Sequence, residues 1–225
     1  MEINLVIPAG GKGSRFSSQE KKQFRQHKGR ALLQWTLDAF LPLEDKLNHI
    51  VIVLPPGEEE QFQTSTMSQK IHTTQGGSTR QDSVHNGFKK LKELEAGGVW
   101  LVHDAARPLL EANSLLALCH KIEETKEGAL LALESRDTIK QSDQNGKVLK
   151  TLDRKYIWQA QTPQGAPADV LWKASLHAQE NDVLTTDEAS LLETYSIPVH
   201  LIAGSPHNRK ITTQEDWEFF THICP

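Results

Sequence analysis

Residues 3–15 read INLVIPAGGKGSR, a short apolar run that ends in glycines and then in basic residues, and Lys22 follows shortly after it. This pattern predicts a buried strand that leads into a phosphate-binding loop. Glycines let backbone N–H groups approach an anion, and Arg15 and Lys22 can supply positive charge. A glycine turn flanked by solvated basic side chains is the alternative interpretation.

The loop departs from the two commonest glycine motifs of nucleotide sites. Phe16 stands where a dinucleotide fold places its third small residue, and no Gly-Lys pair is followed by Ser or Thr as in a P-loop. What remains is a G-G-x-G-x-R loop with Lys22 behind it, which suits a triphosphate.

The bulk composition narrows the function classes. A length of 225 residues predicts one large α/β domain over residues 1–225. A net charge of -4 provides no global basic field and therefore argues against nucleic-acid binding through bulk electrostatics. Cys119 and Cys224 stand far apart without a partner motif, so a disulfide scaffold or zinc cluster is not expected. With no signal sequence and no apolar run of membrane-spanning length, we expect a cytoplasmic protein without a membrane partner.

Strands and helices alternate along the sequence. Short apolar runs predict strands at 3–7, 49–54, near 71, and at 99–102, 129–133 and 199–203. Amphipathic patterns predict a helix from about 32 that Pro42 ends and a polar helix at about 58–67. They also predict a helix that the turn at 76–84 opens, with Val84, Phe88 and Leu91 on its apolar face, and further helices at 113–124, at 168–179 and after 213. This alternation predicts a three-layer α/β sandwich around a mostly parallel sheet.

Two further loops come directly after strands or open helices. Residues 76–83 form a second glycine-bearing turn, and residues 103–108 follow the strand at 99–102. Ligands bind at the carboxyl ends of strands in open α/β sheets, so we expect these loops to meet the first one. Asp104 could orient a ribose or Mg²⁺, or it could simply cap a turn. His103 is interpreted as structural.

Residues 135–157 interrupt the alternating pattern. Asn145-Gly146 lies between two short runs and predicts a β-hairpin. The hairpin has little apolar surface to bury on its own body, which an arm reaching a partner subunit would explain, although a solvated surface hairpin is equally compatible with the pattern. Farther on, residues 185–188 have the form of a capping box that starts with Thr185, and Thr213 is expected to cap the last helix with Asp216 in its first turn.

The ordered set of motifs resembles the 2-C-methyl-D-erythritol 4-phosphate cytidylyltransferase family over almost the whole chain. Besides the three loops, the resemblance rests on residues 136–138, 153–154, 161–164, 186–189 and 208–212. It implies a Rossmann-like nucleotidyltransferase fold and a homodimer joined through the hairpin arm. It also implies transfer of CMP from CTP to a polyol phosphate, with Mg²⁺, in non-mevalonate isoprenoid synthesis.

The resemblance assigns roles by position. It implies transition-state stabilisation by Arg15 and Lys22, and positioning of the acceptor phosphate by Arg154 and Lys210. It implies a nucleotide site made of Ala9, Gly10, Gly11, Gly77, Ser83, Asp104 and Ala105. It implies an acceptor site that includes Arg107, Thr138, Thr162 and the position of His207. An acceptor phosphate is already anionic and needs no strong base, so this chemistry requires mainly positioning and charge neutralisation.

Two positions depart from the family pattern. His207 stands where an aspartate is usual, and Ser78 replaces a frequent acidic residue. An imidazole does not accept hydrogen bonds as a carboxylate does, so the identity of the polyol is left open. A ribitol 5-phosphate cytidylyltransferase and a non-catalytic nucleotide-binding module are the alternatives.

Overall fold

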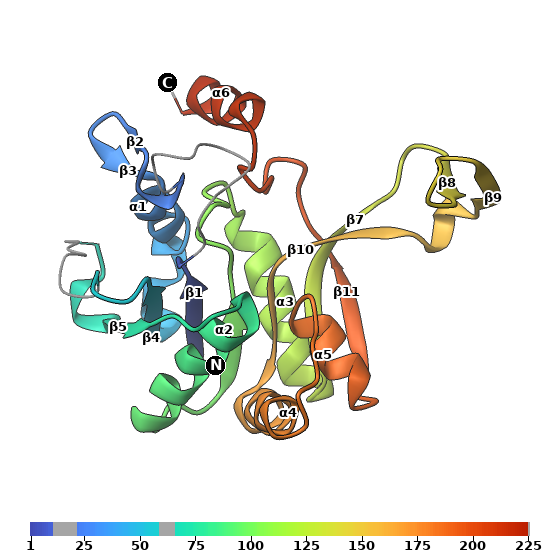
Figure 1. The fold of residues 1–225 in the computed structure, drawn as a ribbon. Helices are drawn as coiled ribbons and strands as arrows, with labels where there is room; N and C mark the ends of the chain where they lie inside the picture. Colours follow the sequence, from blue (N-terminus) through green and yellow to red (C-terminus); the bar gives the residue numbers. More distant parts are fainter. Residues whose placement is uncertain (11–21, 59–65, 225) are drawn as a thin grey trace.

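A seven-stranded sheet forms the centre of the molecule (Figure 1). The computed structural model describes residues 1–10, 22–58 and 66–224. In spatial order the strands are β11 (Val199–Ala203), β7 (Gly128–Glu134), β10 (Trp158–Pro167), β6 (Val99–Val102), β1 (Ile3–Pro8), β4 (Leu47–Leu54) and β5 (Ile71–Gln75). β10 pairs antiparallel with β6 and β7, and the other pairings within this sheet are parallel. The expectation of a mostly parallel sheet is confirmed.

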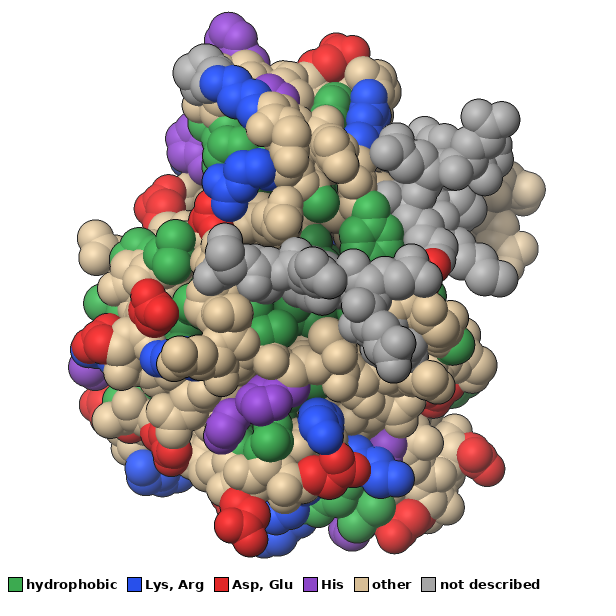
Figure 2. All heavy atoms as spheres, turned by 90° about the vertical axis from the view of Figure 1, so that its left-hand side faces the viewer, with side chains coloured by type: hydrophobic (Ala, Val, Ile, Leu, Met, Phe, Trp, Pro, Cys, Tyr) green, Lys and Arg blue, Asp and Glu red, His purple; other side chains and the backbone are tan. Residues whose placement is uncertain are grey.

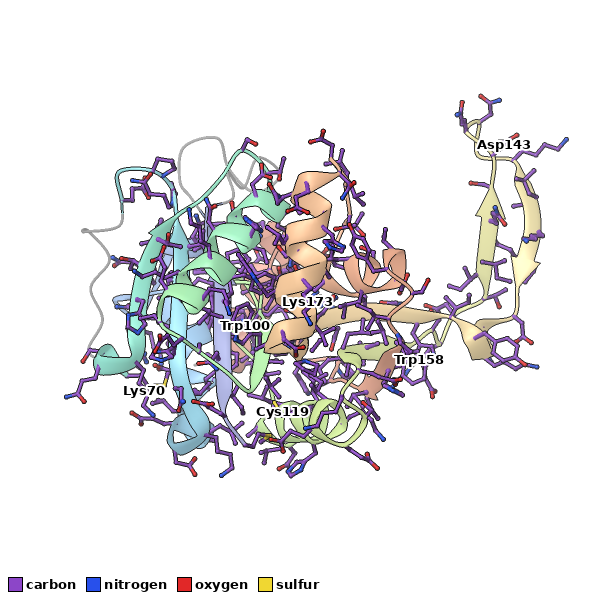
Figure 3. The ribbon with its side chains drawn as sticks, turned by 90° about the horizontal axis from the view of Figure 1, so that it is seen from below. Lys70, Trp100, Cys119, Asp143, Trp158 and Lys173 are labelled. Carbon is purple, nitrogen blue, oxygen red and sulfur yellow. The ribbon has the colours of Figure 1, made fainter. Side chains whose placement is uncertain are left out.

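Helices cover both faces of the sheet and give the predicted three layers. One apolar cluster packs α1 (Leu32–Asp38) and α3 (Ala112–Thr125) against one face. A second packs α2 (Arg80–Glu93), α4 (Ala168–Glu180) and α5 (Glu188–Thr194) against the other. In Figure 3 Cys119, on α3, lies on one side of the sheet, and Lys173, on α4, lies on the other.

β1 shows why the sheet is buried on both faces. Its side chains alternate with a period of two, so Ile3, Leu5 and Ile7 enter the first cluster while Val6 enters the second. All four side chains are fully buried. A strand that is apolar at consecutive positions is therefore central, with a helical layer above and below.

Reciprocal capping boxes start α2 (Arg80–Glu93) and α6 (Gln214–Ile223), and the sequence predicted the second of them. Thr79 caps α2 by accepting a hydrogen bond from the Asp82 amide, and Asp82 completes the capping box. Thr213 and Asp216 make the same reciprocal pair at α6, which confirms the expectation for that helix.

The expected end of the first helix is wrong. α1 ends at Asp38 rather than at Pro42, and Pro42 lies at the start of a 3-10 helix, η2 (Leu41–Lys46). Proline has no N–H to donate, and the first turn of a helix needs none. Pro42 therefore begins the next element instead of ending the previous one.

The expected capping box at 185–188 is also shifted. The cap of α5 is Asp187, which accepts from the Ser190 amide while the Ser190 hydroxyl accepts from the Asp187 amide. The amide and hydroxyl of Thr185 instead donate to Oε1 of Gln81 on α2. Glu188 is thereby released from capping and is buried.

A small hairpin stands away from the central sheet (Figures 1 and 3). Its strands are β8 (Ile139–Ser142) and β9 (Val148–Leu152), and the short helix η5 (Arg154–Tyr156) leads back to β10. Asp143 lies at the tip and Trp158 near the base. The role of this hairpin as an arm toward a partner stays a prediction.

The remaining short elements are β2 (Gln26–His27), β3 (Arg30–Ala31), η1 (Lys22–Phe24) and η4 (Ser68–Lys70). The polar helix expected at about 58–67 falls mostly outside the described residues. Within the described part of the chain, no helix combines the length and the hydropathy that a membrane crossing needs.

Candidate active site

The loops after β1, β4 and β5 meet at the carboxyl ends of these strands. The Ala9 amide donates to Val53 O at 2.8 Å, and the Gly76 amide donates to Leu54 O at 2.7 Å. A Cβ on Gly10 would lie 4.0 Å from Ser83 Oγ, which places the end of β1 beside the start of α2. The start of the first glycine loop therefore lies beside the second glycine loop, as predicted, while residues 11–21 of the first loop lie outside the described residues.

Ser83 organises the second glycine loop. Its hydroxyl donates to Thr79 O at 2.8 Å and accepts from the Gly77 amide at 3.1 Å. A hydroxyl has two lone pairs, so one acceptor position remains for a donor such as an exocyclic amine of a base. A Cβ on Gly77 would lie 2.3 Å from Cβ of Asp82, so this turn requires glycine.

The segment that carries Lys22 lies against the end of β1. The side-chain Nε2 of Gln23 donates to Ala9 O, and Gln23 is buried. This contact holds η1 beside the residue that follows β1. Gly11 and Arg15, which the sequence also assigns to the site, lie outside the described residues.

Asp104 is the centre of a second group of charges, at the end of β6. Its Oδ2 lies 3.0 Å from Lys210 Nζ and 3.2 Å from Arg107 Nε, and its Oδ1 lies 3.8 Å from a terminal nitrogen of Arg80. Burial alone would raise the pKa of Asp104, but the three neighbouring positive charges outweigh burial and hold that pKa well below its usual range. The carboxylate is therefore charged at any pH near neutrality.

A buried hydrogen-bond chain supports Asp104 from below. The Asp104 amide donates to Thr162 Oγ1 at 3.0 Å, and the Thr162 hydroxyl lies 3.1 Å from Nδ1 of His103. Nε2 of His103 lies 3.0 Å from Arg107 O, which can only accept. Nε2 therefore carries the proton and Nδ1 accepts from Thr162. Burial lowers the pKa of His103 to about 4, which agrees with a neutral structural imidazole.

The loop after β11 joins this group through Asn208. Nδ2 of Asn208 donates to Thr162 O at 2.7 Å, and Asn208 O accepts from Arg107 at 2.7 Å. The Ile211 amide donates to Ala106 O, next to Ala105. These contacts fix the backbone on both sides of Lys210. His207 lies in the same loop, exposed, with its ring stacked on Phe219 at 6.3 Å.

The structure leaves two predicted acceptor residues apart from this group. Thr138 and Arg154 are exposed at the base of the hairpin, which stands away from the central sheet (Figure 1). Arg154 donates to Arg136 O across that base. Any part they take in the same site stays a prediction.

Arg80 and Glu188 lie at the site, although the sequence analysis does not name them as site residues. Arg80, the first residue of α2, donates to both carboxylate oxygens of Glu188, at 2.8 and 3.1 Å. It also links the second glycine loop to Asp104. The two partners are 108 positions apart, and the local pattern marks Glu188 only as a helix-start residue. Nothing in the linear sequence joins them.

In the described part of this site, Asp104 is the residue that can offer an oxygen to a hard cation. Among the described residues there is no group of three or more His, Cys, Asp and Glu side chains placed to hold a metal. Oδ2 of Asp104 is bound to Lys210 and Arg107, while Oδ1 has Arg80 at 3.8 Å, beyond hydrogen-bond distance. One free carboxylate oxygen fits Mg²⁺ that arrives with a nucleotide, since this ion takes one or two carboxylates plus phosphate oxygens.

Comparison with known proteins identifies relatives over the full length of the described fold. The family model of 2-C-methyl-D-erythritol 4-phosphate cytidylyltransferase (IspD) matches residues 3–223. A protein of that name from Haemophilus influenzae is 39% identical over 220 residues, which cover 95% of this chain and 92% of the relative. One from Acinetobacter baumannii is 38% identical over 225 residues, covering 97% of this chain and 92% of the relative.

A solved structure agrees with the sequence relatives. The crystal structure of the Francisella tularensis 2-C-methyl-D-erythritol 4-phosphate cytidylyltransferase superposes with a TM-score of 0.80 and 31% identity, over 99% of both chains. The arrangement of strands and loops described above is therefore shared with an enzyme of this name.

Proposed function

The chain belongs to the 2-C-methyl-D-erythritol 4-phosphate cytidylyltransferase family, and we propose that it transfers CMP from CTP to 2-C-methyl-D-erythritol 4-phosphate, releasing pyrophosphate, in isoprenoid precursor synthesis. The observation that carries this function is the position of Asp104. At the carboxyl end of β6, its carboxylate lies with Arg107 and Lys210 and within 3.8 Å of Arg80, the residue that begins α2 after the second glycine loop. A nucleotide site beside a cationic site is what transfer between two phosphates requires.

The glycine loops are proposed to bind CTP. The glycines of the first loop are proposed to bind the triphosphate through backbone amides, on the sequence pattern. The free acceptor position on Ser83, with the amides around Gly77, suits the cytosine edge. Asp104 and Ala105 then lie where ribose and phosphate meet. Arg15 and Lys22 are proposed to neutralise charge that builds up on the α-phosphate and the leaving pyrophosphate.

Lys210 and Arg107 are proposed to receive the acceptor. Lys210 is the more accessible cation, with 40% of its side chain exposed against 11% for Arg107. An incoming phosphate can replace Asp104 as the ion-pair partner of Lys210, while Arg107 keeps its hydrogen bond to Asn208 O. The phosphate oxygen is already an anion, so binding it in line with the α-phosphorus is the main catalytic requirement.

We propose that Asp104, through Oδ1, would hold Mg²⁺ together with phosphate oxygens of CTP. When bound, the ion supplies charge neutralisation to the triphosphate. The residues described here would bind and orient the two substrates around it.

The hairpin at 135–157 is proposed to join two copies of the chain as a homodimer. Val148, Leu149 and Tyr156 are 55%, 59% and 74% exposed on and beside it, which is apolar surface a partner could cover. Thr138 and Arg154 would then complete the partner's acceptor site, with His207 facing the polyol. We further propose one domain over residues 1–225 and a cytoplasmic location.

A direct assay decides the acceptor. CTP and Mg²⁺ are incubated with 2-C-methyl-D-erythritol 4-phosphate, with ribitol 5-phosphate, or with no acceptor, and pyrophosphate release is followed. We expect release only with the first acceptor, as the names of the relatives favour. Turnover confined to ribitol 5-phosphate would contradict the proposal. CTP binding without turnover on either acceptor would favour the non-catalytic module.

A further inference from the structure

Arg80 lies between two buried carboxylates and is bound to only one of them. Both of its terminal nitrogens donate to Glu188, at 2.8 and 3.1 Å. The carboxylate of Asp104 is the next nearest, with Oδ1 3.8 Å from Arg80 Nη2. At that distance the two charges attract, but no hydrogen bond forms. Arg80 has no part in the mechanism proposed above.

β10 and α5 fix the position of Glu188. The side-chain amide of Gln164, on β10, accepts from the Ala189 amide at 2.9 Å and donates to the Asp187 carboxylate at 3.0 Å. It therefore forms hydrogen bonds with both sequence neighbours of Glu188. Glu188 is only 3% exposed. A bidentate carboxylate held this firmly sets both the distance and the angle of the guanidinium.

Only one carboxylate oxygen of Asp104 is without a hydrogen-bond partner among the described residues. Oδ2 is already bound to Lys210 and Arg107, so Oδ1 is the oxygen left for a nucleotide that binds with its Mg²⁺. A shift of the guanidinium by about one ångström would bring it within hydrogen-bond distance of Oδ1. Both oxygens of Asp104 would then be occupied by the protein's own cations.

We propose that Glu188 is a positioning residue that holds Arg80 away from Asp104 and so keeps Oδ1 available to CTP bound with its Mg²⁺. This inference rests on the proposed function, in which Asp104 contacts the nucleotide. Glu188 acts through Arg80 and does not touch the substrate. Without the negative charge of Glu188, Asp104 is the nearest carboxylate, and Arg80 turns to it.

The test compares Glu188→Gln with Arg80→Gln. We expect Glu188→Gln to raise the KM for CTP, and the Kd measured by calorimetry without acceptor, about tenfold, with kcat changed less than about twofold. Arg80→Gln removes the guanidinium that would block Oδ1, so its KM for CTP should stay below about a third of that in Glu188→Gln. The double variant should bind CTP more tightly than Glu188→Gln alone.

This asymmetry separates positioning from mere support of the fold. If the ion pair served only to support the fold, Arg80→Gln should weaken CTP binding at least as much as Glu188→Gln does, because it leaves the buried carboxylate of Glu188 unpaired. Melting temperatures of all variants are measured alongside, and Glu193→Gln removes an exposed charge from the same helix as a matched control. If Glu188→Gln does not fold, Glu188→Asp keeps the charge but shortens its reach, and it should raise the KM in the same direction.

The outcomes distinguish this inference from the proposed function. Unchanged CTP affinity in folded Glu188→Gln, or an equal loss in Arg80→Gln, would overturn the inference while wild-type turnover stands. Failure of the wild-type protein to bind CTP would overturn both.

Discussion

His103 shows how one buried side chain supports the site without taking part in the chemistry. Nδ1 of its neutral ring accepts a hydrogen bond from the Thr162 hydroxyl, and Nε2 donates one to Arg107 O. The Thr162 hydroxyl in turn accepts a hydrogen bond from the backbone amide of Asp104. Protonation at Nδ1 would set a donor against the Thr162 hydroxyl and place a charge in a fully buried position. The ring is therefore useful only while it is neutral.

This arrangement predicts a pH dependence of stability. The pKa of His103 is lowered by burial to about 4, against about 6.5 in the unfolded chain. Between these values the unfolded state binds a proton that the folded state does not, so stability should be complete above pH 6.5 and fall as the pH is lowered to about 4, by about 3 kcal/mol in all. Urea unfolding of the wild type and of His103→Gln across this range measures it. Parallel curves for the two proteins would contradict the assignment.

Lys22 carries a prediction of a different kind. If it stabilises charge that develops only in the transition state, Lys22→Ala should lower kcat about a hundredfold to a thousandfold while CTP affinity changes little. Steady-state kinetics gives both quantities, and Lys89→Ala, an exposed lysine on α2, is the control. An unchanged kcat would remove Lys22 from the catalytic set.

At the scale of elements, α6 links two segments that are far apart in the sequence. Gln214 accepts from Arg25 at 3.0 Å, and the guanidinium of Arg25 lies 4.4 Å above the ring of Trp217. The Asp216 carboxylate accepts from the amides and hydroxyls of Thr212 and Thr213. Figure 2 shows Lys and Arg side chains on both the upper and the lower parts of this side of the molecule, and Figure 1 places β2, β3 and α6 at the upper part. α6 thus braces both the Lys22 segment and the Lys210 loop.

Asp216→Asn tests this brace. The variant keeps the shape of the side chain but loses the charge that strengthens four hydrogen bonds, so we expect a stability loss of about 1–2 kcal/mol. Because the Lys210 loop ends at these bonds, the KM for the acceptor should rise while the KM for CTP stays near the wild-type value. Glu215→Gln removes the neighbouring exposed charge and should change neither the stability nor the KM for the acceptor. An equal rise in both KM values would argue against a local effect.

The elements that could be predicted are those whose determinants are local. Thr79 and Asp82, three positions apart, are sufficient to start α2, and the run of consecutive apolar residues in β1 is sufficient to bury that strand on both faces. The start of α5 could not be predicted this way, because Thr185 and Asp187 both suit a cap and only the distant Gln81 side chain decides between them. Asp104 was found because it follows a strand, whereas Arg80 and Glu188 meet only through the tertiary fold.

At the scale of the whole molecule, the hairpin predicts a site shared between two copies. We expect Arg154→Ala to raise the KM for the acceptor. When it is co-expressed with Lys22→Ala, a mixed dimer should contain one intact site, since Arg154 of one chain would serve Lys22 of the other. Random pairing then gives about a quarter of the wild-type activity.

The control is the co-expression of two differently tagged Lys22→Ala chains, which should gain nothing. Activity of the mixed preparation no higher than that of the two variants alone would indicate that each site is built within one chain.

β10 begins beside Trp158 at the base of the hairpin, then carries Thr162 under Asp104 and Gln164 against α5. A single strand therefore connects the surface proposed for subunit contact with both supports of the nucleotide site. If partners hold the hairpin, dissociation releases one end of that strand. Specific activity should then fall on dilution more steeply than the loss of shared acceptor residues alone would cause, and CTP should slow the dissociation of subunits.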